Sequence, residues 1–370
     1  MKNIVYMDHN ATAPIYPAVV DAMTHALSHV GNPSSVHRSG REARKLMEEA
    51  REQVARLVNV PSDWVIFTSG GTEADALALN GVDVDRVLVS SVEHAAVMQA
   101  RDDLEVLEVD KNGVVSLEAL EKALKGDDRA TLVSIVGANN ETGVIQPLKE
   151  IVEICHAHGA LIHSDAVQLA GKCDFDMQSL GLDLISLSAH KLGGPQGVGA
   201  LVKRAGLTLT PLNKGGGQER SMRGGTENLS GIVGFGAAVE EKRDFSAIKA
   251  LRDELEVQIK ALGAVVFGET VERIPNTSYF AIEGMASERQ VMALDLAGVM
   301  VSAGSACSSG KVKASHVLKA MGVKDELAGS AIRVSLGWNS TKEDIDFFVQ
   351  AYTKIVERVQ ARKTSHSNAA

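Results

Sequence analysis

The chain has 370 residues, of which 45% are hydrophobic, 23% are charged and 4% are aromatic. This is the composition of a folded globular protein, and the length is enough for one large domain and a smaller one. The net charge of -9 and the scarcity of aromatic side chains argue against a binder of nucleic acid.

The N-terminus and the cysteines indicate a soluble protein of a reducing compartment. Early polar residues interrupt the N-terminal segment, which excludes a secretory signal peptide, and no apolar run reaches the roughly 20 residues that span a membrane. The three cysteines, Cys155, Cys173 and Cys307, have neither the number nor the spacing of a disulfide framework or a thiolate metal site. We therefore expect a cytoplasmic protein without membrane contact.

Short β-branched runs alternate with glycine-rich turns and helical patterns through the first two thirds of the chain. Strands are expected at residues 66–67, 87–89, 132–136, 161–162 and 184–187, each followed by a polar cluster, and a helix at 41–57. This alternation is typical of an α/β domain with a mainly parallel sheet. Functional groups in such sheets collect at the carboxyl ends of the strands.

A charge-rich segment at 240–244 predicts the passage into a smaller α+β domain. Strands are expected at 264–267, 277–282, 300–302 and 332–336, and a helix at 248–262. Ser287 with Gln290, and Ser340 with Glu343, have the spacing of capping boxes that start two more helices. The expected division is a large domain at 13–240, a small domain formed by 1–12 with 241–362, and a disordered tail at 363–370.

Two charged residues follow neighbouring predicted strands. Lys191 lies in a glycine-bordered turn, where a desolvated lysine has a lowered pKa and can attack a carbonyl to form a Schiff base. Asp165 ends the preceding strand. Pyridoxal phosphate needs both groups, a lysine for its aldehyde and a carboxylate for its pyridine nitrogen. Taken alone, Lys191 fits an ordinary surface lysine, and Asp165 fits a helix cap.

Other segments add a phosphate cradle and a thiol. Residues 69–73, Ser-Gly-Gly-Thr-Glu, precede a helix whose N-terminal N–H groups suit a phosphate, and they have neither P-loop nor GxGxxG spacing. His94 follows a strand end and fits either a cofactor contact or a helix start. Cys307 lies among small residues at 302–310, which favours a thiol presented on a loop, whereas Cys155 lies on an apolar helix face and is expected to be buried. Cys173 receives no role.

Seven separated motifs in this order, from Tyr6 to about Gly337, resemble the cysteine desulfurases. These are pyridoxal-phosphate enzymes of the class V aminotransferase family, with the fold-type I architecture, and they supply sulfur for iron–sulfur clusters and thiolated RNA. The sequence SAGSACSSG at 302–310 is similar to the NifS/IscS branch. The resemblance implies a homodimer that takes L-cysteine and passes sulfur to an acceptor or scaffold protein.

The resemblance also implies a role for each matching residue. Lys191 would hold pyridoxal 5′-phosphate, Asp165 would pair with its ring nitrogen, Gln168 would contact its ring hydroxyl, and His94 would stack on the ring and serve in catalysis. Its phosphate would be held by Thr72, next to Gly71, by Ser188 and His190, and by Thr226 of the other subunit. The substrate carboxylate would be bound by Asn140 and Arg333, and Cys307 would be the nucleophile that receives the sulfur as a persulfide.

The chain departs from the family pattern in three places. Gln218 stands where some relatives have histidine, Ala303 replaces a serine common in the cysteine loop, and the chain after Gly337 is shorter than in relatives whose tail meets a scaffold protein. The sulfur acceptor is therefore left open.

Several alternative functions stay open on the sequence. A selenocysteine lyase, a cysteine-sulfinate desulfinase and another class V aminotransferase-fold enzyme share most of the motifs. A non-catalytic sulfur-relay scaffold is disfavoured by the intact Lys191, Asp165 and Cys307. A metal site is disfavoured because His156 and His158, two residues apart, would not share a helix face.

Overall fold

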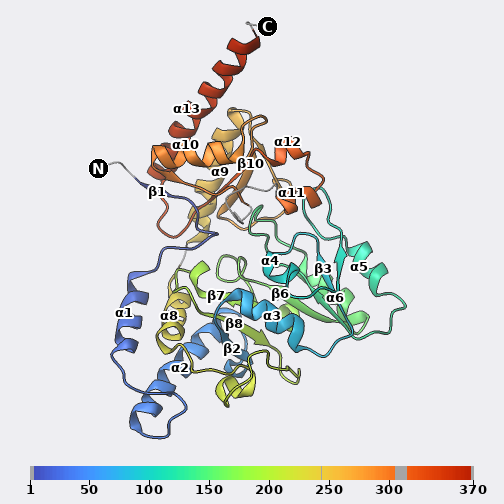
Figure 1. Ribbon diagram of the computed structural model, residues 1–370, viewed down its shortest axis with the longest axis vertical. Helices are drawn as coiled ribbons and strands as arrows, with labels where there is room; N and C mark the ends of the chain where they lie inside the picture. The colour runs from blue at the N-terminus through green and yellow to red at the C-terminus, as the bar shows by residue number, and fades with distance from the viewer. Residues whose placement is uncertain (1–3, 243, 305–314, 368–370) are drawn as a thin grey trace.

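The computed structural model describes residues 4–242, 244–304 and 315–367 (Figure 1). Its larger part is built on a seven-stranded sheet with the order β2-β8-β7-β6-β5-β3-β4. The strands are β2 (Val65–Thr68), β3 (Arg86–Ser90), β4 (Leu104–Leu107), β5 (Thr131–Ser134), β6 (Leu161–Asp165), β7 (Leu184–Ser188) and β8 (Gly199–Lys203). Strand β8 alone runs opposite to the other strands of this sheet, so the predicted α/β class with a mainly parallel sheet is confirmed.

Helices cover both faces of this sheet. The helices of the larger part are α1 (Pro17–Leu27), α2 (Arg38–Leu57), α3 (Gly71–Gly81), α4 (Ala95–Met98), α5 (Leu117–Leu124), α6 (Leu148–Ala157), α7 (Met177–Leu180) and α8 (Leu229–Glu240). Short 3₁₀ turns lie at η1 (Ser62–Trp64), η2 (Ala189–Lys191) and η3 (Gln218–Ser221). Figure 1 shows α1, α2 and α8 together at one side, and α8 packs against both of its partners.

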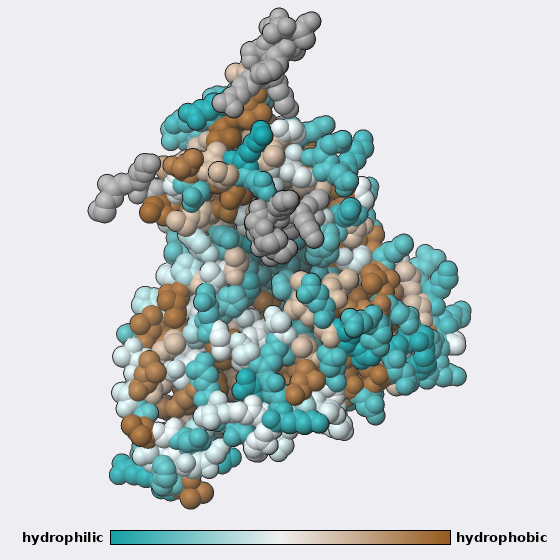
Figure 2. Space-filling model, viewed as in Figure 1, coloured by the Kyte–Doolittle hydropathy of each residue, from teal (hydrophilic) through white to brown (hydrophobic). Residues whose placement is uncertain are grey.

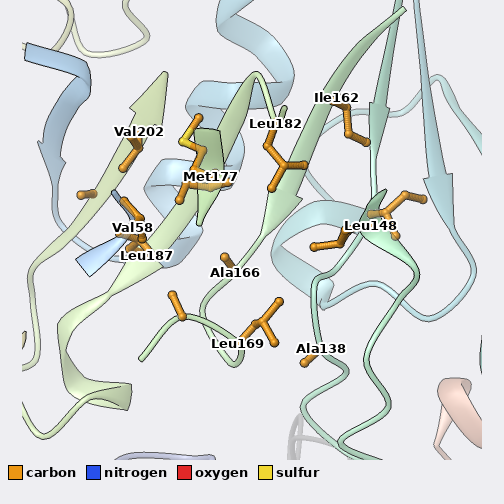
Figure 3. Close-up of a cluster of buried hydrophobic side chains, with 14 of the residues drawn as sticks. Val58, Ala138, Leu148, Ile162, Ala166, Leu169, Met177, Leu182, Leu187 and Val202 are labelled. Atoms are coloured by element: carbon orange, nitrogen blue, oxygen red, sulfur yellow. The ribbon is translucent and has the colours of Figure 1, made fainter. Parts of the chain in front are cut away.

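The strand side chains alternate between two apolar clusters. Phe67 of β2 and Leu187 of β7 pack with α2, α6, α7 and α8, and Figure 3 shows part of this cluster around Met177 and Leu148. Ile66 and Leu184 face the opposite cluster with α3. Burial on both faces explains why these strands read as continuous apolar runs. Cys155 is fully buried in the first cluster, as predicted.

The smaller part holds a three-stranded antiparallel sheet with the order β12-β10-β9. Its elements are α9 (Phe245–Ala261), β9 (Val265–Val266), β10 (Thr277–Ala281), α10 (Ser287–Ala297), β11 (Val299–Met300), α11 (His316–Ala320), α12 (Asp325–Ala328), β12 (Ala331–Ser335) and α13 (Lys342–Ser367). The N-terminal strand β1 (Val5–Tyr6) pairs with β11 in parallel. Met7 packs in one apolar cluster with Ile248 of α9 and Phe348 of α13. The N-terminal segment therefore lies beside the last third of the chain.

Two predicted helix starts and the predicted tail differ from the structure. Ser287 accepts no capping hydrogen bond, and the Gln290 amide instead donates to the Met285 and Ser330 carbonyls. The capping box at the start of α13 joins Thr341 and Asp344, one residue later than expected, by 2.9 and 3.2 Å hydrogen bonds. Helix α13 continues to Ser367, so residues 363–367 are helical rather than disordered.

In the part of the chain that the structure describes, every helix is too short or too polar to span a membrane.

Candidate active site

A cavity of about 260 Å³ opens at the carboxyl ends of the parallel strands. Its walls come from the loops that follow β2, β3, β5, β6 and β7, the positions at which the sequence placed polar clusters. The residues that line it are Gly71, Thr72, Asp75, His94, Val136, Ala138, Asn140, Asp165, Val167, Gln168, Ser188, His190 and Lys191. Nine of the twelve residues predicted for the site therefore line one cavity, and a tenth, Arg333, donates a hydrogen bond to the carbonyl of one of the nine, Asn140.

Lys191 lies in η2, immediately after β7, and points at the N-terminal segment. Its ammonium group donates to the carbonyl oxygens of Asn10 at 2.6 Å and Ala11 at 2.8 Å. Removal from water and the nearby Arg333 guanidinium lower its pKa to about 8. A lysine with this pKa exists in part as the neutral amine near neutral pH, which is the form that attacks carbonyls and accepts protons.

Asp165 ends β6 and is buried, and one of its oxygens accepts a hydrogen bond from the Val167 N–H at 2.9 Å. Burial raises the pKa of Asp165, although the Val167 hydrogen bond, His94 and Lys191 oppose the shift. Asp75 of α3 is also buried beside the cavity, and burial together with the Asp165 charge raises its pKa. Two buried carboxyl groups in one cavity wall suit a ligand that presents a cationic N–H group.

His94 lies at a helix start, one of the two interpretations that the sequence left open, and it also lines the cavity. It is the N-cap of α4, where its Nδ1 accepts a hydrogen bond from the Ala96 N–H at 3.1 Å, and the same ring lines the cavity. Because Nδ1 is an acceptor, the neutral ring carries its proton on Nε2. Partial removal from water lowers the pKa of His94 and favours this neutral form.

The cavity floor near α3 has the donors of an anion site. Gly70 caps this 11-residue helix without a side-chain acceptor, and the hydroxyls of Thr72 and Ser188 lie beside the first turn. A Cβ at Gly199 would lie 2.6 Å from the Gly70 carbonyl carbon, so glycine is required for β8 to pass this close. Helix N–H groups, hydroxyls and the His190 ring are donors that fit a phosphate group.

Arg333 of β12 brings a guanidinium from the smaller part of the chain. It donates to the Asn140 carbonyl at 2.9 Å and to the Asp8 carboxylate at 2.6 Å, and its side chain is buried. Its Nε is buried and without a partner among the described residues. Arginine presents a planar set of donors that matches a carboxylate, and Asp8 is the carboxylate that it holds here.

The predicted residue Thr226 is not brought to the cavity of its own chain. Thr226 is exposed on the segment between η3 and α8 and does not line it. Cys307 lies outside the described residues. The cavity wall also contains Asp75, which was not predicted from the sequence. An acidic residue inside a helical pattern is usually assigned to the solvent-exposed face of the helix. In the described parts of the chain, no cluster of histidine, cysteine and acidic residues could hold a metal ion.

Comparison with known proteins agrees with this fold. The family model described as aminotransferase class-V matches residues 5–348. A protein of Dictyoglomus turgidum named cysteine desulfurase IscS is 41% identical over 97% of this chain and 96% of its own length. A cysteine desulfurase of Cereibacter sphaeroides is 43% identical over 96% and 97%. A solved NifS-like protein from Rickettsia africae has a TM-score of 0.89 at 36% identity, covering 96% of this chain and all of that one.

The chain therefore belongs to the class-V aminotransferase family, with the fold-type I architecture. Within that family it is of the NifS/IscS-like cysteine desulfurase kind, as the sequence motifs predicted.

Proposed function

We propose that the protein is a pyridoxal-phosphate-dependent cysteine desulfurase. It converts L-cysteine and a thiol of the protein into L-alanine and a protein persulfide, in which the carbon–sulfur bond of cysteine breaks and a sulfur–sulfur bond forms. The observation that carries the proposal is the single cavity shared by Lys191, Asp165 and the donors at the start of α3. The names of the relatives supply the substrate class.

The donors in this cavity fit pyridoxal 5′-phosphate group by group. Lys191 would bind its aldehyde and Asp165 its ring nitrogen, and Gln168 and His94 would contact its ring oxygen and ring face. The phosphate would be held by the remaining donors, which are Gly71, Thr72, Ser188 and His190. When bound, this cofactor supplies an electron sink that makes the α-proton of an amino acid acidic.

The side chains of the protein perform the remaining steps. Arg333 and Asn140 would bind the carboxylate of L-cysteine, with Arg333 exchanging Asp8 for the substrate. The neutral amine of Lys191 would accept the α-proton and return it. The thiolate of Cys307 would attack the substrate sulfur, because only the thiolate is an effective nucleophile. The persulfide would then pass to an acceptor protein for iron–sulfur cluster assembly or RNA thiolation.

The second part of the proposal concerns the assembly. We propose a cytoplasmic homodimer in which Thr226 reaches the phosphate in the other subunit, since it is exposed and lies away from its own cavity. We also propose the division into a large domain at 13–240 and a small domain formed by 1–12 with 241–362.

Substitution of the cysteines tests the nucleophile. In Cys307→Ala, we expect release of L-alanine from L-cysteine to fall at least 100-fold while the visible absorbance of the bound cofactor is unchanged. Cys173→Ala is the matched control, because Cys173 is half-buried away from the cavity, and it should keep the wild-type rate. Wild-type alanine release by Cys307→Ala would refute the assignment. Lys191→Ala should abolish both the absorbance and the activity.

A further inference from the structure

Lys172 is a buried lysine in contact with Gln168, one of the residues that line the candidate active site. It lies seven residues after the end of β6, is 5% exposed, and contacts both Gln168 of the cavity lining and Asn10 of the N-terminal segment. Its ammonium group donates to the Gln168 carbonyl oxygen, Oε1, at 2.5 Å and to the Asn10 side-chain oxygen, Oδ1, at 3.0 Å. Burying a lysine is costly unless its charge is bonded in this way, so the contact calls for an explanation.

The contacts of Gln168 allow only one orientation of its amide group. An ammonium group is donor-only, so the atom of Gln168 that faces Lys172 must be the oxygen. The Asn10 backbone carbonyl is acceptor-only, and the Gln168 nitrogen, Nε2, donates to it at 2.9 Å. Each contact requires the same orientation, and the reversed amide would place like groups together at both ends.

The donors and acceptors around the Asn10 side chain fix the orientation of its amide group in the same way. Its nitrogen donates to the Asn140 carbonyl at 3.1 Å and to the Thr277 hydroxyl at 2.8 Å. Its oxygen accepts from Lys172 and, at 3.1 Å, from the Asn276 amide. The Asn10 side chain is therefore bonded at both ends of its amide, and its oxygen holds the Lys172 ammonium group against Gln168. Lys191 also donates to the Asn10 backbone carbonyl, whereas Lys172 is the charged group that contacts the Gln168 oxygen.

We propose that Lys172 is a positioning residue that holds the Gln168 amide so that an N–H group, and not the carbonyl oxygen, faces the cavity. Gln168 lines the cavity, and among the described residues only one of its two N–H groups has a protein acceptor. The second N–H group is thereby a donor for the ligand. The site then selects a ligand with an acceptor oxygen at this point, which in the proposed function is the unprotonated ring oxygen of pyridoxal 5′-phosphate.

Binding of two ligands to the apoprotein tests this inference, which rests on the proposed function. The ligands are pyridoxal 5′-phosphate and 3-deoxypyridoxal 5′-phosphate, which lacks the ring oxygen. Lys172→Met should bind the first about 10- to 100-fold more weakly, the loss of one charge-assisted hydrogen bond. It should bind the deoxy analogue as wild type does. Lys249→Met is the matched control and should change neither affinity. Lys249 and Lys172 line one surface groove, but the Lys249 side chain is 57% exposed.

Two further variants separate positioning from folding. Lys172→Gln keeps a polar group at this position, but that group can also accept a hydrogen bond. This variant should therefore lose part of the preference for pyridoxal 5′-phosphate over the 3-deoxy analogue, and it provides the test if Lys172→Met does not fold. In Lys172→Met with Gln168→Ala, affinity for pyridoxal 5′-phosphate should equal that of Gln168→Ala alone.

Equal losses for both ligands, or no loss for either, in the Lys172 variants would overturn the inference. If wild-type protein binds neither ligand, the proposed function fails and the inference falls with it.

Discussion

Lys191 shows how one residue acquires reactivity from its surroundings. Its pKa falls from 10.5 to about 8 because the side chain leaves water and lies near Arg333. Below about pH 8 the amine is protonated and inert, and above it the amine is neutral and nucleophilic.

We therefore expect trace acylation of Lys191 in the apoprotein to reach half its maximal rate constant near pH 8. An ordinary lysine reaches this point near pH 10.4. Mass spectrometry of the labelled peptides would measure the acylation of Lys191 and of an ordinary lysine in one sample. A midpoint for Lys191 at or above pH 10 would contradict the prediction, and the midpoint should rise when Arg333→Met removes the nearby positive charge.

The position of a residue in the chain decides whether its role in the site could be predicted from the sequence. Lys191, Asp165 and His94 each follow a strand end, so a parallel-sheet pattern is enough to bring them together. Lys172 was not predicted, although its four-residue spacing from Gln168 in a helical turn was visible. Its hydrogen-bond partner Asn10 lies 162 residues away in the sequence, and a local sequence pattern cannot predict a contact over that separation.

At the scale of elements, the segment between β8 and α8 is anchored by one buried ion pair. Arg51 of α2 makes two hydrogen bonds, of 2.7 and 2.8 Å, with Glu219 of η3, and both side chains are 2% exposed. Glu219 also accepts from the Phe67 N–H of β2 at 2.9 Å. Helix, strand and loop therefore meet at one carboxylate.

We expect Glu219→Ala to lower the free energy of unfolding by about 3 kcal/mol. The buried Arg51 would keep only its pair with Glu48, whose side chain is 40% exposed, and the Phe67 N–H group would lose its acceptor. Urea denaturation would measure the loss. Arg56→Ala is the control on the same helix, since its pair with Glu240 is about half exposed, and it should cost less than about 1 kcal/mol. Similar losses in the two variants would contradict the prediction.

Element boundaries divide into those that periodicity predicts and those that it misses. The apolar spacing in α2 predicted residues 41–57, and the helix covers Arg38–Leu57. Strand β8 was not predicted, because its sequence, GALVK, is short and follows a glycine-rich loop, and its antiparallel direction depends on pairing with β2 and β7. The Ser287 capping box failed because tertiary contacts with Ser330 took the Gln290 amide.

At the scale of the whole molecule, apolar side chains are exposed around α1 and the loop that follows it. Leu27 is 71% exposed, Val30 89% and Val36 88%. Figure 2 shows brown patches along this side of the molecule, the side where Figure 1 places α1. Exposed apolar groups gathered on one face mark an interaction surface, and the proposed dimer gives that surface an occupant, the second copy.

We expect the double variant Val30→Asp with Val36→Asp to sediment near the chain mass of 39.2 kDa, whereas the wild type should sediment near twice that mass. Buried aspartates in the contact would cost several kcal/mol per subunit, enough to separate the dimer at micromolar concentration. Affinity for pyridoxal 5′-phosphate should fall in the same variant, because Thr226 of the other subunit would be lost from the phosphate. Val106→Asp is the matched control, being 51% exposed on the edge strand β4, and it should stay dimeric. A dimeric double variant would place the contact elsewhere on the surface.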